Sequence, residues 1–226
     1  MTVSTPASFA LVARGLRLYL GERQLLDGVD LDVPSGSAVA VTGPSGSGKT
    51  SLLMVLSSVL PPDSGTVEIV PTGERSGSSA EQDEGAPVVG FVPQTLGLAR
   101  HLSAAENVAV PLESRRLPPA EVRERVGQAL ASVRLGTVAD RIVTELSGGQ
   151  RQRVAIARAL AVMPHVLVAD EATAELDPES RELVLGLFHA EADRGSAVVI
   201  ATHDPKVIET CSESYRLEDG MLRRDS

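Results

Sequence analysis

Residues 43–50 read Gly43-Pro44-Ser45-Gly46-Ser47-Gly48-Lys49-Thr50, which matches the pattern G-x-x-x-x-G-K-[ST]. Glycines allow consecutive backbone N–H groups to turn inward and form a nest for an anion. The buried-type run at residues 38–42 predicts a strand before this loop, and a helix is expected from Lys49 to Leu60, ended by Pro61-Pro62. Such a helix points its partially positive N-terminus at the same anion. The stretch therefore predicts a phosphate-binding loop.

The side chains at the end of this loop suit a nucleoside triphosphate and its metal ion. Lys49 is expected to reach the β- and γ-phosphates as a point charge. The Thr50 hydroxyl is a hard oxygen ligand suited to Mg²⁺, which keeps several of its waters. A carboxylate near this metal is also needed, and the apolar run at 166–169 ends in Asp170 and Glu171. We expect Asp170 to hold Mg²⁺ through water and Glu171 to polarise the attacking water.

The order of elements along the chain predicts an α/β protein. Strands are expected within residues 8–42, 66–70, 88–92, 166–169 and 197–201, with a closing hairpin at Asp219-Gly220. Helices are expected at 103–116, 119–134, 147–162 and 178–193, and a short one begins at Pro205. This alternation predicts an α/β core with a parallel sheet, and together with the phosphate-binding loop the chain resembles a P-loop NTPase (RecA-like) core with a mostly parallel sheet. An N-terminal antiparallel β region and an inserted α-helical subdomain complete the expected fold.

The chain is read as one domain, residues 1–226, in two parts. Residues 1–94 and 163–226 are expected to form the catalytic core, and residues 95–162 the helical subdomain. Residues 71–87 carry almost no large apolar side chain and are expected to be a flexible, acidic loop.

Composition excludes several classes of protein. The 226 residues include 21 basic and 30 acidic side chains, a net charge of −9, which disfavours nucleic-acid binding. A single cysteine cannot form an internal disulfide and fits a reducing compartment. No apolar run reaches the length of a membrane span, and no secretory signal is visible at the N-terminus. Any role at a membrane is therefore expected to depend on a partner protein. The Asn-Lys-x-Asp motif of guanine nucleotide proteins is absent, which argues against a Ras-like GTPase.

A third motif lies between the two phosphate motifs. Residues 146–153 read Leu146-Ser147-Gly148-Gly149-Gln150-Arg151-Gln152-Arg153, and this stretch resembles the signature motif of ABC-type ATPases. Ser147 is expected to cap the helix that follows, with Gly148 and Gly149 leaving backbone N–H groups exposed. The resemblance extends over essentially the whole chain.

The resemblance implies roles for further residues. Tyr19 matches the aromatic residue that stacks on adenine, and Gln94 resembles the glutamine that contacts Mg²⁺ and couples to the membrane partner. Asp177 belongs to a loop that crosses the dimer interface, and His203 resembles the histidine that contacts the γ-phosphate. The catalytic residues implied are Glu171, His203, Gln94 and Lys49; the metal ligands are Thr50, Gln94 and Asp170. The nucleotide-binding residues implied are Tyr19, Gly43, Pro44, Ser45, Gly46, Ser47, Gly48, Lys49, Thr50, Ser51, Ser147, Gly148, Gly149, Gln150 and Asp177.

The family implies ATP and Mg²⁺ as cofactors and two kinds of partner. Two chains are expected to sandwich ATP head to tail between residues 43–50 of one and Ser147–Gly149 of the other. A homodimer would then have two competent sites, and a heterodimer stays open. A separate transmembrane permease is expected to hold the chain at the inner face of the cell membrane, with its coupling helix in a groove near Gln94 and residues 98–112.

The branch of the family and two rival functions also follow from the sequence. Phe91–Gln94 and Thr202–Pro205 look like the lipoprotein-release and macrolide-export branch, although Ala172 stands where the family usually has proline and Ser37 where glutamate is common. One alternative is an ATPase that mechanically regulates a membrane partner without transport. The other is a nucleotide-sensing module that binds without turnover, against which Asp170, Glu171 and His203 argue.

Overall fold

The computed structural model describes residues 8–72 and 86–225, so most of the acidic stretch expected as a flexible loop at 71–87 lies outside the described residues. Two sheets are formed. The smaller one is antiparallel, as expected for the N-terminal region, with strand order β2-β1-β4. Its strands are β1 (Phe9–Leu20), β2 (Arg23–Val33) and β4 (Ser64–Pro71).

The larger sheet has six strands in the order β5-β6-β7-β3-β8-β9, and only the last pair is antiparallel. Its strands are β3 (Ala38–Thr42), β5 (Val89–Val92), β6 (Val166–Asp170), β7 (Ala197–Ala201), β8 (Glu213–Glu218) and β9 (Met221–Arg224). The expected closing hairpin is present: Asp219 and Gly220 have φ values of 49° and 77°, the left-handed pair that such a tight turn requires. The predicted α/β class with a mostly parallel sheet is confirmed.

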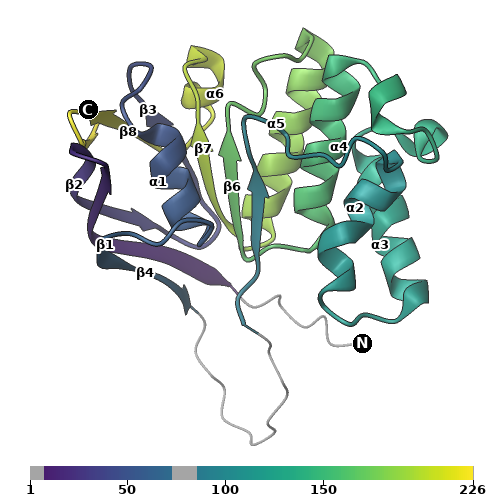
Figure 1. The fold of residues 1–226 in the computed structure, drawn as a ribbon, viewed down its shortest axis with the longest axis horizontal. Coiled ribbons are helices and arrows are strands. Elements are labelled where there is room, and N and C mark those ends of the chain that lie inside the picture. Colours follow the sequence, from purple (N-terminus) through teal and green to yellow (C-terminus); the bar gives the residue numbers. More distant parts are fainter. Residues whose placement is uncertain (1–7, 73–85, 226) are drawn as a thin grey trace, which may run out of the picture.

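Helices cover both faces of the larger sheet (Figure 1). Helix α1 lies between the two sheets, and α2, α3, α4 and α5 gather on the opposite side. The helices are α1 (Lys49–Leu56), α2 (Ala104–Glu113), α3 (Pro119–Ser132), α4 (Gly148–Ala161), α5 (Pro178–Asp193) and α6 (Pro205–Glu209). Single turns of 3₁₀ helix occur at Gly136–Val138 and Val143–Glu145. None of the helices in the described part of the chain is both long and apolar enough to cross a membrane.

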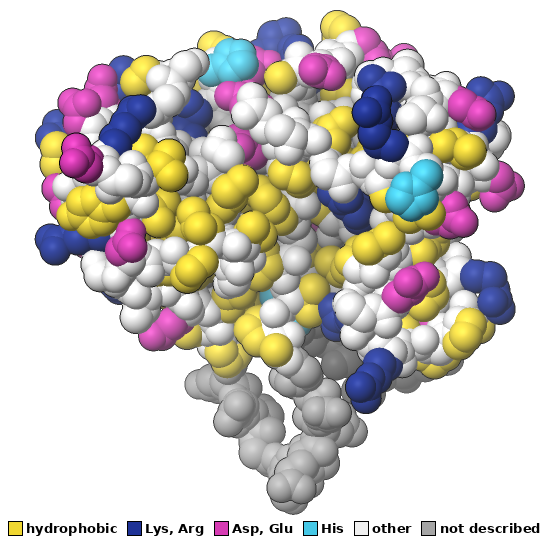
Figure 2. All heavy atoms as spheres, viewed as in Figure 1, with side chains coloured by type: hydrophobic (Ala, Val, Ile, Leu, Met, Phe, Trp, Pro, Cys, Tyr) yellow, Lys and Arg dark blue, Asp and Glu magenta, His cyan; other side chains and the backbone are white. Residues whose placement is uncertain are grey.

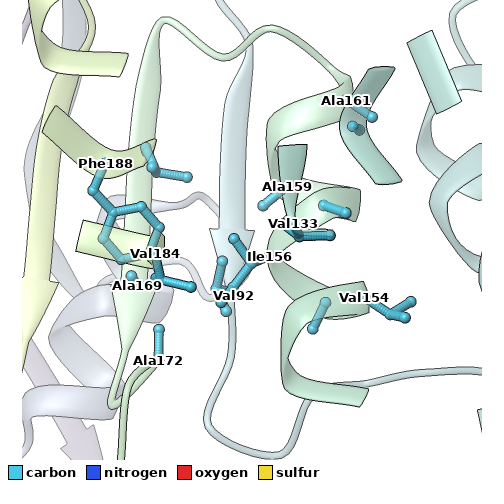
Figure 3. Packing of buried hydrophobic residues seen from close by; sticks show 14 of the residues in the cluster. Val92, Val133, Val154, Ile156, Ala159, Ala161, Ala169, Ala172, Val184 and Phe188 are labelled. Atoms are coloured by element: carbon cyan, nitrogen blue, oxygen red, sulfur yellow. The ribbon is translucent and has the colours of Figure 1, made fainter. Parts of the chain in front are cut away.

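Two hydrophobic cores meet at the larger sheet, because its central strands are buried on both faces. In β6, Val166 and Val168 pack into the core that contains α1, whereas Leu167 and Ala169 pack into the core that contains α2 to α5. Figure 3 shows the second core, where Phe188 of α5 lies beside β6 and its neighbours. Because β6 is held from both sides, Asp170 at its end has a defined position.

Helix α1 is shorter than expected, ending at Leu56 rather than Leu60. The stop comes from Ser58, whose φ of 59° is left-handed, and not from the later prolines. The backbone N–H groups of Val59 and Leu60 both turn back to the carbonyl of Met54, which satisfies the end of the helix locally.

Candidate functional site

The 43–50 loop has a backbone that only glycine can form at two of its positions. Gly43 has φ 140°, and a Cβ there would lie 2.2 Å from the carbonyl oxygen of Leu217. Gly48 has φ 101°, and a Cβ there would lie 2.9 Å from the carbonyl oxygen of Leu25. The loop is therefore pressed against β2 and β8, and helix α1 begins immediately after it at Lys49.

Lys49 and Thr50 point to different parts of the site. The Lys49 ammonium group donates hydrogen bonds to the carbonyl oxygens of Gly43 (2.8 Å) and Pro44 (3.1 Å), so it lies across the loop. The Thr50 hydroxyl donates to Oδ2 of Asp170 at 2.7 Å. The second bond links the two phosphate motifs of the sequence, which are far apart in the chain.

Asp170 and Glu171 differ in their surroundings although they are neighbours. Asp170 is 1% exposed, and burial raises the pKa of its carboxyl above the ordinary value, although the hydrogen bond from Thr50 opposes the shift. Glu171 leaves the strand with φ 49°, and its N–H donates to the carbonyl of Ala201 at the end of β7. Its carboxylate lies 2.9 Å from Nδ1 of His203. The side-by-side pairing of β6 and β7 therefore brings the ends of two strands together.

An open cavity of about 380 Å³ lies in front of these groups. It is lined by Arg23, Leu25, Ser45, Gly46, Gly48, Lys49, Thr50, Ser51, Gln94, Asp170 and Glu171. The structure thus gathers Lys49, Thr50, Gln94, Asp170 and Glu171 around one space. A cavity of this size matches a small-molecule site.

Arg23 is a lining residue that the sequence analysis missed. Its guanidinium donates to the carbonyl of Gly46 at 2.9 Å, so it braces the phosphate-binding loop from the start of β2. An exposed arginine after a turn has no recognisable pattern, and only the packing of β2 against the loop reveals it.

Three predicted nucleotide-binding elements do not line this cavity in the single chain. Tyr19 is 48% exposed, and its backbone N–H donates to Asp63. Asp177 caps helix α5 by accepting from the N–H of Ser180, and these hydrogen bonds lower the pKa of its carboxyl. Residues 147–150 form a capping box at the start of α4, in which Ser147 and Gln150 each bond the other's backbone N–H.

The glycines after Ser147 face the loop at 174–177. A Cβ on Gly148 would lie 3.5 Å from Oε2 of Glu175, and one on Gly149 would lie 3.7 Å from the Leu176 side chain. Gly148 and Gly149 therefore lie beside the loop that contains Asp177.

The residues around the cavity fit Mg²⁺ rather than a metal held by protein alone. The described residues contain no group of three or more His, Cys, Asp or Glu side chains that could hold an ion. They do place Thr50 and Asp170 oxygens together beside the phosphate-binding loop. Mg²⁺ keeps several waters and needs only one or two protein ligands when phosphate oxygens supply others.

Comparison with known proteins places this geometry in context. The family model described as ABC transporter matches residues 26–174. A sulfate/thiosulfate import ATP-binding protein of Thermosynechococcus vestitus is 43% identical over 90% of this chain, and a methionine import ATP-binding protein of Brucella abortus is 36% identical over 97% of it. The chain spans 60% and 61% of the length of these two relatives.

Two further relatives match over nearly their whole length. A lipoprotein-releasing system ATP-binding protein of Bacteroides thetaiotaomicron is 36% identical, over 93% of this chain and 98% of that protein. An ATP-binding cassette solved as a dimer in a post-hydrolysis state with ADP and Pi superimposes with a TM-score of 0.82 and 32% identity. That match covers 96% of this chain and 98% of the other.

Proposed function

This chain belongs to the ABC transporter family of ATP-binding cassette ATPases, and we propose that it hydrolyses ATP to drive a separate transmembrane permease. The observation that carries the proposal is the joining of both phosphate motifs at one cavity, where Thr50 donates to Asp170 at 2.7 Å and where Glu171, a lining residue, lies 2.9 Å from His203. A loop that binds phosphate without turnover would not need the second pair.

In the proposed reaction the chain positions ATP and water rather than forming a covalent bond to either. The nest of backbone N–H groups at 43–50 holds the phosphates, and Lys49 leaves the Gly43 and Pro44 carbonyls to contact them. Glu171 orients the attacking water and holds its proton at the carboxylate. His203, whose side chain is 76% exposed, orients that carboxylate through Nδ1 and keeps its other ring nitrogen accessible.

Mg²⁺, when bound, neutralises charge on the phosphate oxygens. Thr50 and Gln94 would offer it oxygen atoms, and Asp170 would hold it through water.

We propose that a second copy of the chain completes the site. Ser147 is exposed and Gly148 and Gly149 are half-buried at the start of α4, and none of the three lines the cavity of its own chain. The ATP-binding cassette with 32% identity was solved as a dimer, which supports the same arrangement here. ATP binding would close such a dimer, and hydrolysis would reopen it.

The proposed docking place for the permease is a groove beside Gln94. A cavity of about 420 Å³ is lined by Thr95, Leu96, Leu98, Arg100, Val143, Thr144 and Arg151. Figure 2 shows a hollow on this face where the sheet side meets the helical side, with basic side chains inside it. Leu98 and Arg100, two of its lining residues, belong to the segment 98–112 where the groove was expected. Docking there would hold the chain at the inner face of the cell membrane.

For the direction of transport we propose export of the lipoprotein-release type. The segments Phe91–Gln94 and Thr202–Pro205 support it, as does the lipoprotein-releasing relative at 36% identity. The import relatives are at least as similar in sequence. The membrane protein that co-purifies with the chain is therefore the deciding observation.

The test of hydrolysis is Glu171→Gln, measured with a phosphate-release assay and by ATP binding at equilibrium. We expect turnover to fall by about 10²-fold or more while ATP still binds and dimers accumulate on gel filtration. Glu182→Gln, on the exposed face of α5, is the control and should keep wild-type turnover. Near-normal hydrolysis by Glu171→Gln would remove Glu171 from its proposed role.

A further inference from the structure

Gln94 lies in a tight turn, and the residues at the end of this turn are bonded to helix α4. The N–H of Leu96 donates to the carbonyl of Pro93 at 3.0 Å, which makes Gln94 the second residue of a four-residue turn. Strand β5 ends just before this turn, at Val92. The direction of the Gln94 side chain, which lines the nucleotide cavity, therefore depends on how the turn is oriented.

The turn continues into an unusual backbone. Leu96 and Gly97 are consecutive left-handed residues, with φ values of 58° and 57°. A leucine adopts this conformation only when its surroundings impose it. With both residues left-handed, their two carbonyl oxygens reach the same group.

That group is the guanidinium of Arg158 on α4. Its Nη2 donates to the carbonyl of Leu96 at 2.5 Å, and its Nη1 donates to the carbonyl of Gly97 at 2.6 Å. Arg158 is partly buried, and burial lowers the pKa of its guanidinium below the usual value. A partly desolvated cation makes strong hydrogen bonds, and the planar fork of arginine suits two adjacent acceptors.

From this geometry we propose that Arg158 is a positioning residue for ATP hydrolysis, which holds the turn at Leu96 and Gly97 so that Gln94 faces the nucleotide cavity. Arg158 itself touches neither nucleotide nor metal. It acts from α4, the helix that begins at Gly148 beside the capping residue Ser147. One helix therefore supports both the predicted dimer contact at its start and the Gln94 turn near its end. The inference rests on the proposed function, because its readout is ATP turnover.

The Asn107 side chain holds the segment that follows the turn, so the effect of Arg158 is limited to the turn itself. Asn107 is 1% exposed, and its side chain bonds the N–H and carbonyl of Ala99 and the carbonyls of Leu102 and Ser103. The segment after residue 98 is thus fixed without Arg158. Loss of Arg158 should release the turn at 93–97 and leave the rest of the segment in place.

The experiment is a double-mutant cycle of Arg158→Gln and Gln94→Ala in the full chain. For each variant we would measure kcat, the Mg²⁺ concentration that gives half-maximal turnover, and the thermal unfolding temperature. We expect each single variant to lower kcat by roughly tenfold and to raise that Mg²⁺ concentration, since small misplacements near reacting groups have effects of this order or larger. The double variant should match Gln94→Ala alone. ATP affinity measured in EDTA should stay within about twofold of the wild type, because it does not involve Mg²⁺ ligands.

Two further variants separate positioning from general stability. Arg158→Lys keeps the charge but lacks the fork, so its kcat should lie between those of Arg158→Gln and the wild type. Arg194→Gln removes another partly buried arginine, one that bonds the carbonyl of Pro164 away from the cavity, and should lower the unfolding temperature without changing kcat.

Multiplicative losses in the double variant, or a fall in unfolding temperature with unchanged kcat for Arg158→Gln, would overturn the proposal. If the wild-type chain does not hydrolyse ATP, the proposed function fails instead.

Discussion

Nδ1 of His203 lies 2.9 Å from Oε1 of Glu171, and this contact joins the ends of two neighbouring parallel strands. Strand β6 ends one residue before Glu171, and β7 ends two residues before His203. Their contact follows from the pairing of the strands, which makes the pair sensitive to substitution at either position.

His203→Ala should lower kcat by about 10²-fold or more and leave ATP affinity nearly unchanged, because the histidine orients Glu171 and does not hold the loop that binds phosphate. Steady-state turnover and equilibrium nucleotide binding measure the two effects. His101→Ala, at an exposed position, is the control. A weaker ATP affinity with normal kcat would place His203 in binding rather than in the reaction.

Asp170→Asn should make the chain more stable and almost inactive. Burial raises the pKa of Asp170, so the folded state binds a proton more tightly than the unfolded state, and stability falls as pH rises through that range. At neutral pH the buried charge is therefore a net destabilising feature that asparagine removes. Thermal unfolding should show the gain at pH 7 and a smaller gain as pH falls towards the ordinary range of a carboxyl group.

For Asp170→Asn we also predict a loss of ATP hydrolysis. Turnover with Mg²⁺ should fall by about 10²-fold or more, since the carboxylate is lost beside the metal. An unfolding temperature below that of the wild type at pH 7 would show that Asp170 is stabilised by its surroundings instead.

Gly43→Ala should destabilise the fold by at least about 2 kcal/mol, because its Cβ would lie 2.2 Å from the carbonyl oxygen of Leu217 at a φ of 140°. Gly186→Ala is the matched control. It lies on the exposed face of α5, where a Cβ would meet nothing within 4 Å, and alanine there should add about 0.5–1 kcal/mol. Chemical denaturation of both variants measures the difference, and equal stabilities would contradict the close approach of the loop to β8.

Ser147→Ala and Ser103→Ala form a pair that separates capping from function. Both serines are N-caps with a full capping box, at α4 and α2 respectively. Each substitution should cost about 1 kcal/mol of stability. Only Ser147→Ala should also reduce turnover, because Ser147 belongs to the stretch proposed to meet the nucleotide of a second copy. Equal turnover in the two variants would leave Ser147 as a cap alone.

Much of the fold could be predicted because its signals are local. The alternation of strands with helices, the cap at Ser147 and the proline at the start of the helix at Pro205 each involve a few consecutive residues. The end of helix α1 was predicted wrongly because a single backbone conformation decides it. Helix α1 stops at Leu56 because Ser58 turns left-handed, and a serine carries no strong signal for that turn.

The sequence by itself determined the phosphate-binding loop, the acidic strand end at Asp170 and Glu171, and the family, since fixed spacings of glycine, lysine and carboxylates encode them. Only the tertiary structure decided that Arg23 braces the loop, that Arg158 holds the Gln94 turn and that Tyr19 stays outside the cavity. Local patterns depend on backbone hydrogen bonds between near neighbours. Contacts between residues far apart in the chain depend on how the sheet and helices pack, and short sequence motifs do not encode that packing.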